Sequence, residues 1–307
     1  MITIIIPTYN AEKYLPKLLN GLKNQSIKNY ELIIIDSSSK DETVNIAKQY
    51  TNNITVIPQS EFDHGGTRNK ALENVDTNIV VYATQDIILE DKYAIEKLIR
   101  VFEDEDVAVA YGRQLPHDNA TYFAKQLREN NYPPKSDIVS IKDKDRLGFK
   151  TFFCSNSFSA YRVSTLKEIG GFKNNLLFGE DAYATAKILL NGYKKVYVAE
   201  AQVKHSHNYS IIEEFRRYFD IGVFHQTESW LITEFGAPMG EGLKYVKKEF
   251  FTLLKQGKLL LCMESILRNG TKFIAYKTGK NYHRVPFFLI KKFTMNKSWW
   301  NKQGNKK

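Results

Sequence analysis

Polar residues follow four short apolar runs in the first ninety residues of the chain. Apolar runs without alternation are typical of parallel strands that are buried on both faces. The carboxyl ends of parallel strands lie at one edge of a sheet, which is where open α/β folds bind their ligands. An isolated Asn or Asp after a strand commonly serves only its turn, whereas several at one edge indicate a binding site. The polar residues are Thr8 and Asn10, Asp36, the segment 59–64, and Gln85 with Asp86.

Two further groups of chemically capable residues occur in the second half of the chain. Glu180 and Asp181 stand at the start of a predicted helix that runs to residue 190, where a carboxylate could accept a proton or serve only as a helix N-cap. His205 and His207 follow a predicted strand at residues 195–199. In an extended segment, side chains two residues apart point to the same face, so both imidazoles are candidate metal ligands and a purely structural role is the alternative.

The elements that must position these groups alternate between strand and helix over residues 1–110. This alternation predicts an α/β fold in which a parallel sheet is covered on both faces. We also expect residues 39–42 to form a capping box, residues 120–151 to form a mobile surface loop, and the segments after Tyr209 to be helical and amphipathic. The predicted strands cover residues 2–6, 32–35, 54–57, 79–83 and 107–111, and the predicted helices lie around residues 15–22, 67–73 and 95–102.

Positive charge is concentrated at the end of the chain. The net charge is +10, but residues 241–307 contain 16 Lys or Arg and 3 Asp or Glu, which leaves +13 there against −3 for the rest. Basic residues mixed with aromatic and aliphatic ones predict peripheral contact with an anionic membrane surface. The residues concerned include Phe250, Phe251, Leu253, Leu254, Leu259, Leu260, Leu261, Phe287, Phe288, Phe293, Trp299 and Trp300. A helical dimer or a core-packing extension is the alternative.

Composition and missing motifs exclude several classes of protein. With 43% hydrophobic and 25% charged residues, the 307-residue chain is globular. Its two cysteines are far apart, which favours a reducing compartment, and no apolar run reaches the length of a membrane span. We therefore expect a cytoplasmic location, free or peripheral on the inner face of the cell membrane. A glycine-rich dinucleotide motif and a P-loop are absent, which argues against a dehydrogenase or an ATPase, and no recognised motif supports nucleic-acid binding.

Four sequence motifs resemble family-2 glycosyltransferases, which have the GT-A fold. They are IIIPTYNAE at residues 4–12, LIIIDSSSKD at residues 32–41, GGF at residues 170–172 and GED at residues 179–181. The resemblance covers roughly residues 1–215. It implies a GT-A-type nucleotide-sugar-binding domain over 1–215 with a mostly parallel central sheet, followed by a helical, basic, amphipathic extension over 216–307. It also implies inverting transfer of a sugar from a nucleotide-sugar donor.

A narrower resemblance links three segments to bacterial rhamnosyltransferases. The segments are FDHGGTRNKA at residues 62–71, TQD at residues 84–86 and HSHNYS at residues 205–210. Enzymes of that branch use dTDP-rhamnose to build O-antigens, capsules and wall polysaccharides, so L-rhamnose is the implied sugar and a saccharide or a polyprenyl-linked chain is the implied acceptor. A UDP-sugar-dependent hexosyl or N-acetylhexosaminyl transferase, or a non-catalytic sugar-nucleotide-binding subunit, remains as an alternative. The oligomeric state is open.

The resemblance also implies roles for the polar residues. The family usually holds a divalent metal with an Asp-x-Asp motif, of which residues 84–86 keep only the last carboxylate. Asp86 and His205, with His207 as the alternative, would bind Mn²⁺ or Mg²⁺, and imidazole favours Mn²⁺. Asp181 would be the general base, and Glu180 would bind or orient the acceptor. The donor-binding residues would be Thr8 and Tyr9 around the base, Asn10, Asp36 at the base or ribose, Gly65 and Arg68 at the diphosphate or sugar, Gln85 and Asp86.

Overall fold

The computed structural model describes residues 1–236 and 239–304 and divides into two compact units. The longest segment of the second unit begins at Asn208, a few residues before the predicted domain boundary at residue 216. Unit 1 comprises Met1–Asp143, Thr151–Asn175 and Glu180–His207, and unit 2 comprises Lys144–Lys150, Leu176–Gly179 and Asn208–Lys307.

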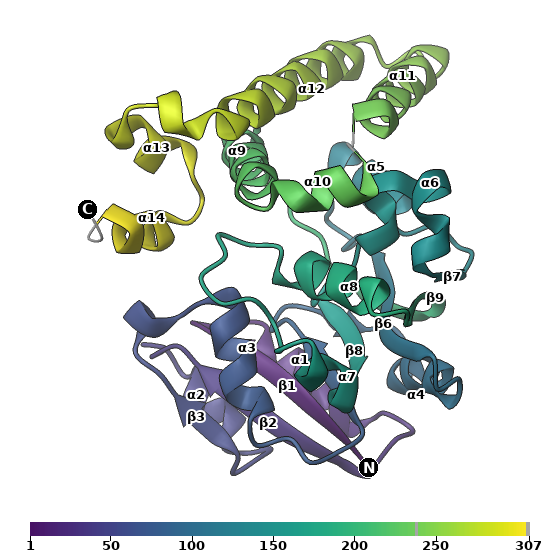
Figure 1. The fold of residues 1–307 in the computed structure, drawn as a ribbon, viewed down its shortest axis with the longest axis vertical. Helices are drawn as coiled ribbons and strands as arrows, with labels where there is room; N and C mark the ends of the chain where they lie inside the picture. Colours follow the sequence, from purple (N-terminus) through teal and green to yellow (C-terminus); the bar gives the residue numbers. More distant parts are fainter. Residues whose placement is uncertain (237–238, 305–307) are drawn as a thin grey trace. The chain divides into compact units, whose positions relative to one another are not determined.

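Unit 1 is built on a nine-stranded sheet with the strand order β3-β2-β1-β4-β8-β6-β9-β5, and β7 also pairs with β9 (Figure 1). Strands β1, β2, β3, β4, β6 and β9 run in one direction. The pairs β1–β2, β1–β4, β2–β3 and β6–β9 are parallel, and β8 is antiparallel to both β4 and β6, so β4 and β6 also share a direction. The predicted mostly parallel sheet is therefore confirmed. The strands are β1 Ile2–Thr8, β2 Tyr30–Asp36, β3 Ile54–Val56, β4 Ile79–Ala83, β5 Ile88–Leu89, β6 Val107–Leu115, β7 Asp137–Val139, β8 Phe158–Arg162 and β9 Lys194–Lys204.

Two hydrophobic cores cover the two faces of this sheet. In β1, Ile4 and Ile6 pack into one core and Ile5 packs into the other, as the two-residue period of a strand requires. The first core contains residues of helices α1 (Leu15–Lys23) and α4 (Ala94–Arg100). The second contains residues of α3 (His64–Leu72), α7 (Val163–Glu168) and α8 (Glu180–Leu190). Because both faces are buried, the middle parts of β1, β2 and β4 are apolar without alternation, which is the pattern seen in the sequence.

Two local predictions are wrong. Ser39 does not cap helix α2 (Thr43–Ala47), whose N-cap residue Glu42 makes no side-chain cap bond; the Ser39 hydroxyl instead donates to the Asp36 carboxylate at 2.6 Å. Residues 120–151 are not a mobile loop. They form α5 (Tyr122–Asn131), β7 and α6 (Lys144–Leu147), and Tyr132 in this segment is buried.

Unit 2 is helical, as predicted for the segments after Tyr209. Helix α9 begins with a complete capping box between Ser210 and Glu213. Its Gly222 allows the backbone of α12 to approach, since a Cβ there would lie 2.3 Å from the carbonyl oxygen of Tyr276. None of the helices in the described chain is long and apolar enough to cross a membrane. The helices are α9 Ile211–Thr227, α10 Ser229–Phe235, α11 Met239–Lys255, α12 Leu259–Lys280, α13 Phe287–Phe293 and α14 Lys297–Gly304.

Some residues predicted to contact a membrane lie inside unit 2. Leu253 is fully buried, and Trp300 is buried in a cluster with Phe219 and Val223 of α9. Phe293 and Trp299 pack against the same cluster. For these four residues the core-packing alternative holds, which leaves the apolar residues of α11, α12 and the start of α13 as the exposed part of the predicted surface.

Candidate active site

Asp86, His205 and His207 form a cluster that could hold a metal ion. One potential ligand atom from each lies within 4.8 Å of the other two. Asp86 follows strand β4 and His205 follows β9, and these strands share one direction, so their carboxyl ends meet at one edge of the sheet. His205 is anchored there by its backbone N–H, which donates to the Leu115 carbonyl at 2.8 Å. The structure thus brings the predicted ligands together, including the alternative His207.

The second ring nitrogen of His205 is held by Gln114 of β6. His205 Nδ1 lies 2.8 Å from Gln114 Oε1, which also accepts from Arg128 Nη1 at 2.7 Å, while Gln114 Nε2 donates to Ser155 Oγ at 2.8 Å. Since the amide oxygen can only accept, Nδ1 carries a proton, and in the neutral imidazole Nε2 then keeps its lone pair. Such a partner is typical of a metal-binding histidine.

The resulting arrangement suits a cation. Nε2 of His205 faces Asp86 Oδ2 across 3.4 Å, so two acceptor atoms are directed at each other, and a metal ion between them would satisfy both. Burial would raise the pKa of the Asp86 carboxyl, but His205 and His207, when their imidazoles are protonated, and the Thr84 hydroxyl hold it well below its usual range. An ionised carboxylate beside imidazole nitrogen is a donor set that suits a divalent metal ion.

Glu180 is buried and ion-paired with Arg68. Glu180 Oε1 lies 3.2 Å from Arg68 Nη1, and the two side chains are 7% and 6% exposed. Asn156 Nδ2 also donates to this oxygen at 3.2 Å. Burial alone would raise the pKa of Glu180, but the charges of Arg68 and His64 and the Asn156 hydrogen bond lower it. Glu180 is therefore ionised at neutral pH.

Asp181 has the opposite electrostatic environment. Burial, and then the negative charge of Glu180, raise the pKa of the Asp181 carboxyl to about 7. Its Oδ2 accepts from the backbone N–H of Asn156 at 3.0 Å. Helix α8 begins at Glu180, and Asp181 Oδ1 also accepts from the backbone N–H of Ala182 at 2.8 Å, so a role in the helix start remains the alternative to catalysis. A carboxyl group with a pKa near neutrality, next to one that stays ionised, is the pattern expected of a general base.

The predicted donor residues Thr8 and Asp36 form a buried pair. Their backbones are register partners in β1 and β2, and Thr8 Oγ1 donates to Asp36 Oδ1 at 2.9 Å. Ser39 adds two donors, its backbone N–H at 2.8 Å and its hydroxyl. Asp36 is fully buried, so its carboxylate is committed to fixing the loop after β2, and its contact with a base or ribose stays a prediction.

Tyr9, Asn10 and Gln85 join neighbouring loops at the same edge. Gln85 Oε1 accepts from Tyr9 N at 2.8 Å and its Nε2 donates to Tyr9 O at 3.1 Å, which ties the end of β4 to the end of β1. Asn10 has a φ of 46° and accepts from Lys40 N at 3.0 Å. The Tyr9 side chain is 37% exposed. A donor contact by these residues also stays a prediction.

Gly65 and Arg68 lie on one helix, α3, whose N-cap is Asp63. A Cβ at Gly65 would stand 2.2 Å from the carbonyl oxygen of Lys173, so this position requires glycine for close packing within unit 1. Arg68 Nη1 donates to His64 O at 2.9 Å besides pairing with Glu180. The structure thus explains both residues by internal contacts, and their approach to a diphosphate stays a prediction.

Sequence reasoning missed Asn156 and Gln114, which hold Asp181, Glu180 and His205 in place. Asn156 precedes the antiparallel strand β8, whose amino end lies at the edge where the parallel strands end. Gln114 lies beyond residue 111, where the predicted strand stopped, although β6 continues to Leu115. For Gln114, the available signal was a polar residue near the end of a buried apolar strand.

Comparison with known proteins shows the family of the chain. Glycosyl transferase family 2 matches residues 3–170. The chain is 45% identical to the O-antigen chain rhamnosyltransferases WbaN of Salmonella anatum, over 97% of this chain and 95% of the relative, and RfbN of Salmonella typhimurium strain LT2, over 98% and 96%.

Solved structures confirm the GT-A fold. The mannosyltransferase PcManGT from Pyrobaculum calidifontis, solved with GDP-Man and Mn²⁺, aligns with a TM-score of 0.62 at 15% identity, over 91% of this chain and 86% of that one. TarS 1–349 of S. aureus, solved with UDP-GlcNAc, aligns with a TM-score of 0.53 at 18% identity, over 92% and 91%. The chain belongs to glycosyl transferase family 2.

Proposed function

We propose that the protein is an inverting rhamnosyltransferase that moves L-rhamnose from dTDP-rhamnose onto a growing cell-surface polysaccharide. The observation that carries the reaction type is the pair Glu180 and Asp181, whose pKa values are shifted in opposite directions. The sugar rests on the two relatives, which are named O-antigen chain rhamnosyltransferases and align over nearly the whole chain. The acceptor is proposed to be a saccharide carried on a polyprenyl lipid.

The proposed reaction is a single displacement. The acceptor hydroxyl oxygen forms a bond to the anomeric carbon while the bond from that carbon to the diphosphate oxygen breaks. Asp181 takes the proton from the attacking hydroxyl, and the nucleoside diphosphate leaves with the bonding electrons. Attack from the side opposite the leaving group inverts the anomeric carbon. Asn156 keeps the Asp181 carboxylate in place through its backbone N–H.

Glu180 and Arg68 support that base. An ionised Glu180 raises the pKa of Asp181, so that Asp181 is basic enough to accept a proton near pH 7. Arg68 balances the charge of Glu180 and keeps it ionised in a buried position. Glu180 is further proposed to orient the acceptor.

A divalent ion, Mn²⁺ in preference to Mg²⁺, is proposed to bind Asp86 and His205, with His207 as an additional or alternative ligand. Such an ion would neutralise the charge that develops on the departing diphosphate. Gln114 fixes the tautomer of His205 that can bind it. The PcManGT structure with Mn²⁺ supports the fold's compatibility with such an ion.

The reaction is proposed to take place at the cytoplasmic face of the cell membrane, with peripheral contact through the basic C-terminal segment. This location would bring the enzyme to a lipid-carried acceptor. The charge of residues 241–307 supports the contact.

A donor screen tests the proposal. Purified protein with Mn²⁺ is given dTDP-rhamnose, UDP-sugars and GDP-sugars, with soluble and lipid-linked saccharide acceptors, and released nucleotide is measured. We expect turnover of dTDP-rhamnose that is lost with chelator and in Asp181→Ala, and retained in Glu73→Gln, which changes an exposed carboxylate outside the site. Preference for a UDP-sugar would overturn the donor. Nucleotide binding without turnover on any acceptor would favour a binding subunit.

A further inference from the structure

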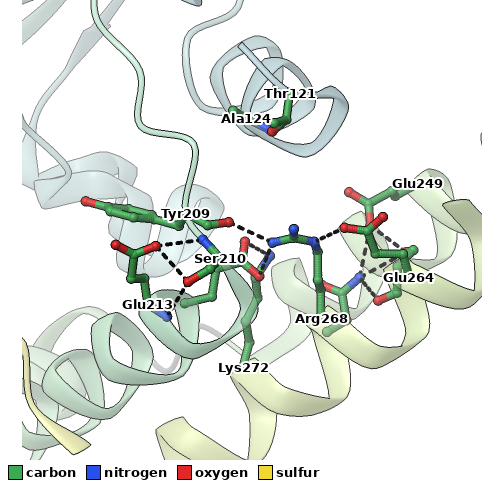
Figure 2. Close-up of polar contacts among 12 residues, drawn as sticks. Thr121, Ala124, Tyr209, Ser210, Glu213, Glu249, Glu264, Arg268 and Lys272 are labelled. Carbon is green, nitrogen blue, oxygen red and sulfur yellow. Dashed lines mark hydrogen bonds and ion pairs between the residues drawn. The ribbon is translucent and has the colours of Figure 1, made fainter.

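Helix α12 directs its polar side into unit 2. Arg268 of α12 pairs with Glu214 of α9 at 3.0 Å and donates to the Tyr209 carbonyl at 3.0 Å. Lys272 pairs with Glu214 at 3.2 Å, and Ser265 donates to Glu249 of α11 at 2.6 Å. Figure 2 shows Arg268 between the Tyr209 carbonyl and Glu264. Charged and hydroxyl side chains thus occupy the face that a helix of a globular protein usually fills with apolar ones.

The opposite face of α12 is apolar and exposed. Leu260 is 83% exposed and Met263 is 69% exposed, and the other members are between 57% and 64% exposed. The spacing 260, 263, 267, 274, with 259, 266, 273 beside it, places them on one side of the helix. They extend over about 24 Å of helix. This outer face of α12 consists of Leu259, Leu260, Met263, Ile266, Leu267, Phe273 and Ile274.

Positive charge lies at both ends of this face. Lys255 and Lys258 precede it and Lys277 and Arg284 follow it, and all four are exposed. Between residues 259 and 274 every charged side chain is bonded within unit 2. Among the described side chains of residues 242–303, the acidic ones are Glu249 and Glu264, and both are held by internal hydrogen bonds. Apart from Glu264, whose side chain is 38% exposed and paired with Arg268, the exposed charges among these described side chains are positive.

The exposed apolar face with positive charge at both ends indicates what kind of surface would bind it. An apolar strip with basic ends complements a layer of hydrocarbon under anionic headgroups. A second copy would place like charges opposite each other if two such faces paired about a twofold axis. We propose that the outer face of α12 lies in the plane of an anionic bilayer, with its apolar side chains below the headgroups and Lys255, Lys258 and Lys277 on the lipid phosphates. The inference rests on the proposed membrane contact and assigns it to one surface.

Vesicle binding tests the assignment without donor or acceptor. Full-length protein is sedimented with phosphatidylcholine vesicles and with vesicles containing about 30% phosphatidylglycerol. We expect binding to the anionic vesicles at low salt. The triple variant Leu260→Ser/Met263→Ser/Leu267→Ser should bind at least tenfold more weakly. The matched control Ile138→Ser/Ile212→Ser, which changes two side chains that are 61% and 65% exposed elsewhere, should bind like the wild type.

The contribution of the lysine charges and the depth of insertion into the bilayer are measured separately. Lys255→Gln/Lys258→Gln/Lys277→Gln should lose about fivefold per lysine at low salt, whereas Lys48→Gln/Lys125→Gln, two exposed lysines of unit 1, should lose nothing. A Leu267→Trp variant should gain blue-shifted fluorescence on anionic vesicles and be quenched by brominated lipid tails. Ile212→Trp is its control and should show neither change.

Three results would overturn the inference. They are absence of vesicle binding by the wild type at low salt, equal binding by the triple serine variant and the wild type, or conversion of a dimer to a monomer by that variant in light scattering with vesicle binding unchanged. Transfer to a soluble acceptor separates the surface from the proposed function. Absence of vesicle binding by a wild-type protein that still transfers sugar rejects only the surface, and vesicle binding by a wild-type protein with no transfer on any acceptor rejects only the function.

Discussion

Removal of the charge on Glu180 should shift the pH dependence of sugar transfer to lower pH. The pKa of Asp181 is raised from 3.8 to about 7, first by burial and then by the charge of Glu180. In Glu180→Gln burial remains, the like charge is gone, and Arg68 is left without its partner and still lowers the Asp181 pKa. A neighbouring charge typically moves a carboxyl pKa by about one to two units, so the pKa of Asp181 should fall to about 5.5.

The size of the effect follows from the fraction of Asp181 that is ionised. With a pKa of about 7, roughly a tenth of the wild type has a basic Asp181 at pH 6, and nearly all has it at pH 8. The ratio of the rate at pH 6 to the rate at pH 8 is then about 0.1. With a pKa of about 5.5 the ratio becomes about 0.8. The ratio is the useful quantity, because a lost acceptor contact lowers both rates equally.

The assay is initial-rate transfer from dTDP-rhamnose to a soluble acceptor between pH 5 and 9, with donor and Mn²⁺ saturating at every pH. Saturation is checked by electron paramagnetic resonance, because protons compete with metal ions for protein ligands at low pH. Glu73→Gln should keep the ratio of about 0.1. A ratio that stays near 0.1 in Glu180→Gln would refute the role of Glu180. More than about a hundredth of the wild-type rate in Asp181→Asn would refute Asp181 as the base.

Three further predictions concern the metal cluster and stability. Gln114→Leu should weaken Mn²⁺ binding about tenfold or more, measured by electron paramagnetic resonance, whereas the control Gln126→Leu should leave the affinity unchanged. Equal Mn²⁺ affinities of Gln114→Leu and the wild type would show that Gln114 does not support metal binding. His205→Ala should weaken Mn²⁺ binding more than His207→Ala, and the reverse order would make His207 the principal ligand. Because the folded pKa of Asp181 lies above the unfolded value, its unfavourable contribution to folding appears as pH rises from about 4 to 7. Asp181→Asn should therefore have a higher Tm than the wild type at pH 8 and a similar Tm at pH 4, and a lower Tm at pH 8 would contradict this.

Strand ends predict that Asp86 lies at the ligand-binding edge of the sheet, and the family resemblance adds His205 as its partner in the candidate metal site. The strand-end signal is local: Asp86 lies three residues beyond an apolar run, and parallel strands end together, whereas His205 lies six residues beyond the predicted strand at residues 195–199. It does not reveal Asn156, since β8 runs the other way and its apolar residues resemble those of its parallel neighbours. Strand direction is set by connection and packing, and no periodicity within five residues encodes it.

The ordered structure of residues 120–151 could not be predicted from the sequence for a related reason. Helix α5 buries only Phe123 and Ala124, so its apolar stripe is too short to produce a clear period. Its ordering comes from distant contacts. Arg128 reaches Gln114 of β6 at 2.7 Å, and Tyr132 packs against the rings of Tyr111 and Phe153. Contacts between residues this far apart in the chain cannot be read from composition.

The basic C-terminal segment shows what periodicity leaves undetermined. Spacing alone establishes that Leu260, Met263 and Leu267 share one side of a helix, but either side could face the protein. The buried ion pair between Arg268 and Glu214 determines which side faces the protein. If α12 were turned over, this pair would break and each charge would lose its partner, which is strongly destabilising. The apolar side is consequently the one left at the surface. A search for lipid-facing residues by residue type alone therefore includes Leu253 and Trp300, which the fold buries, whereas the direction of the polar side separates the two sets.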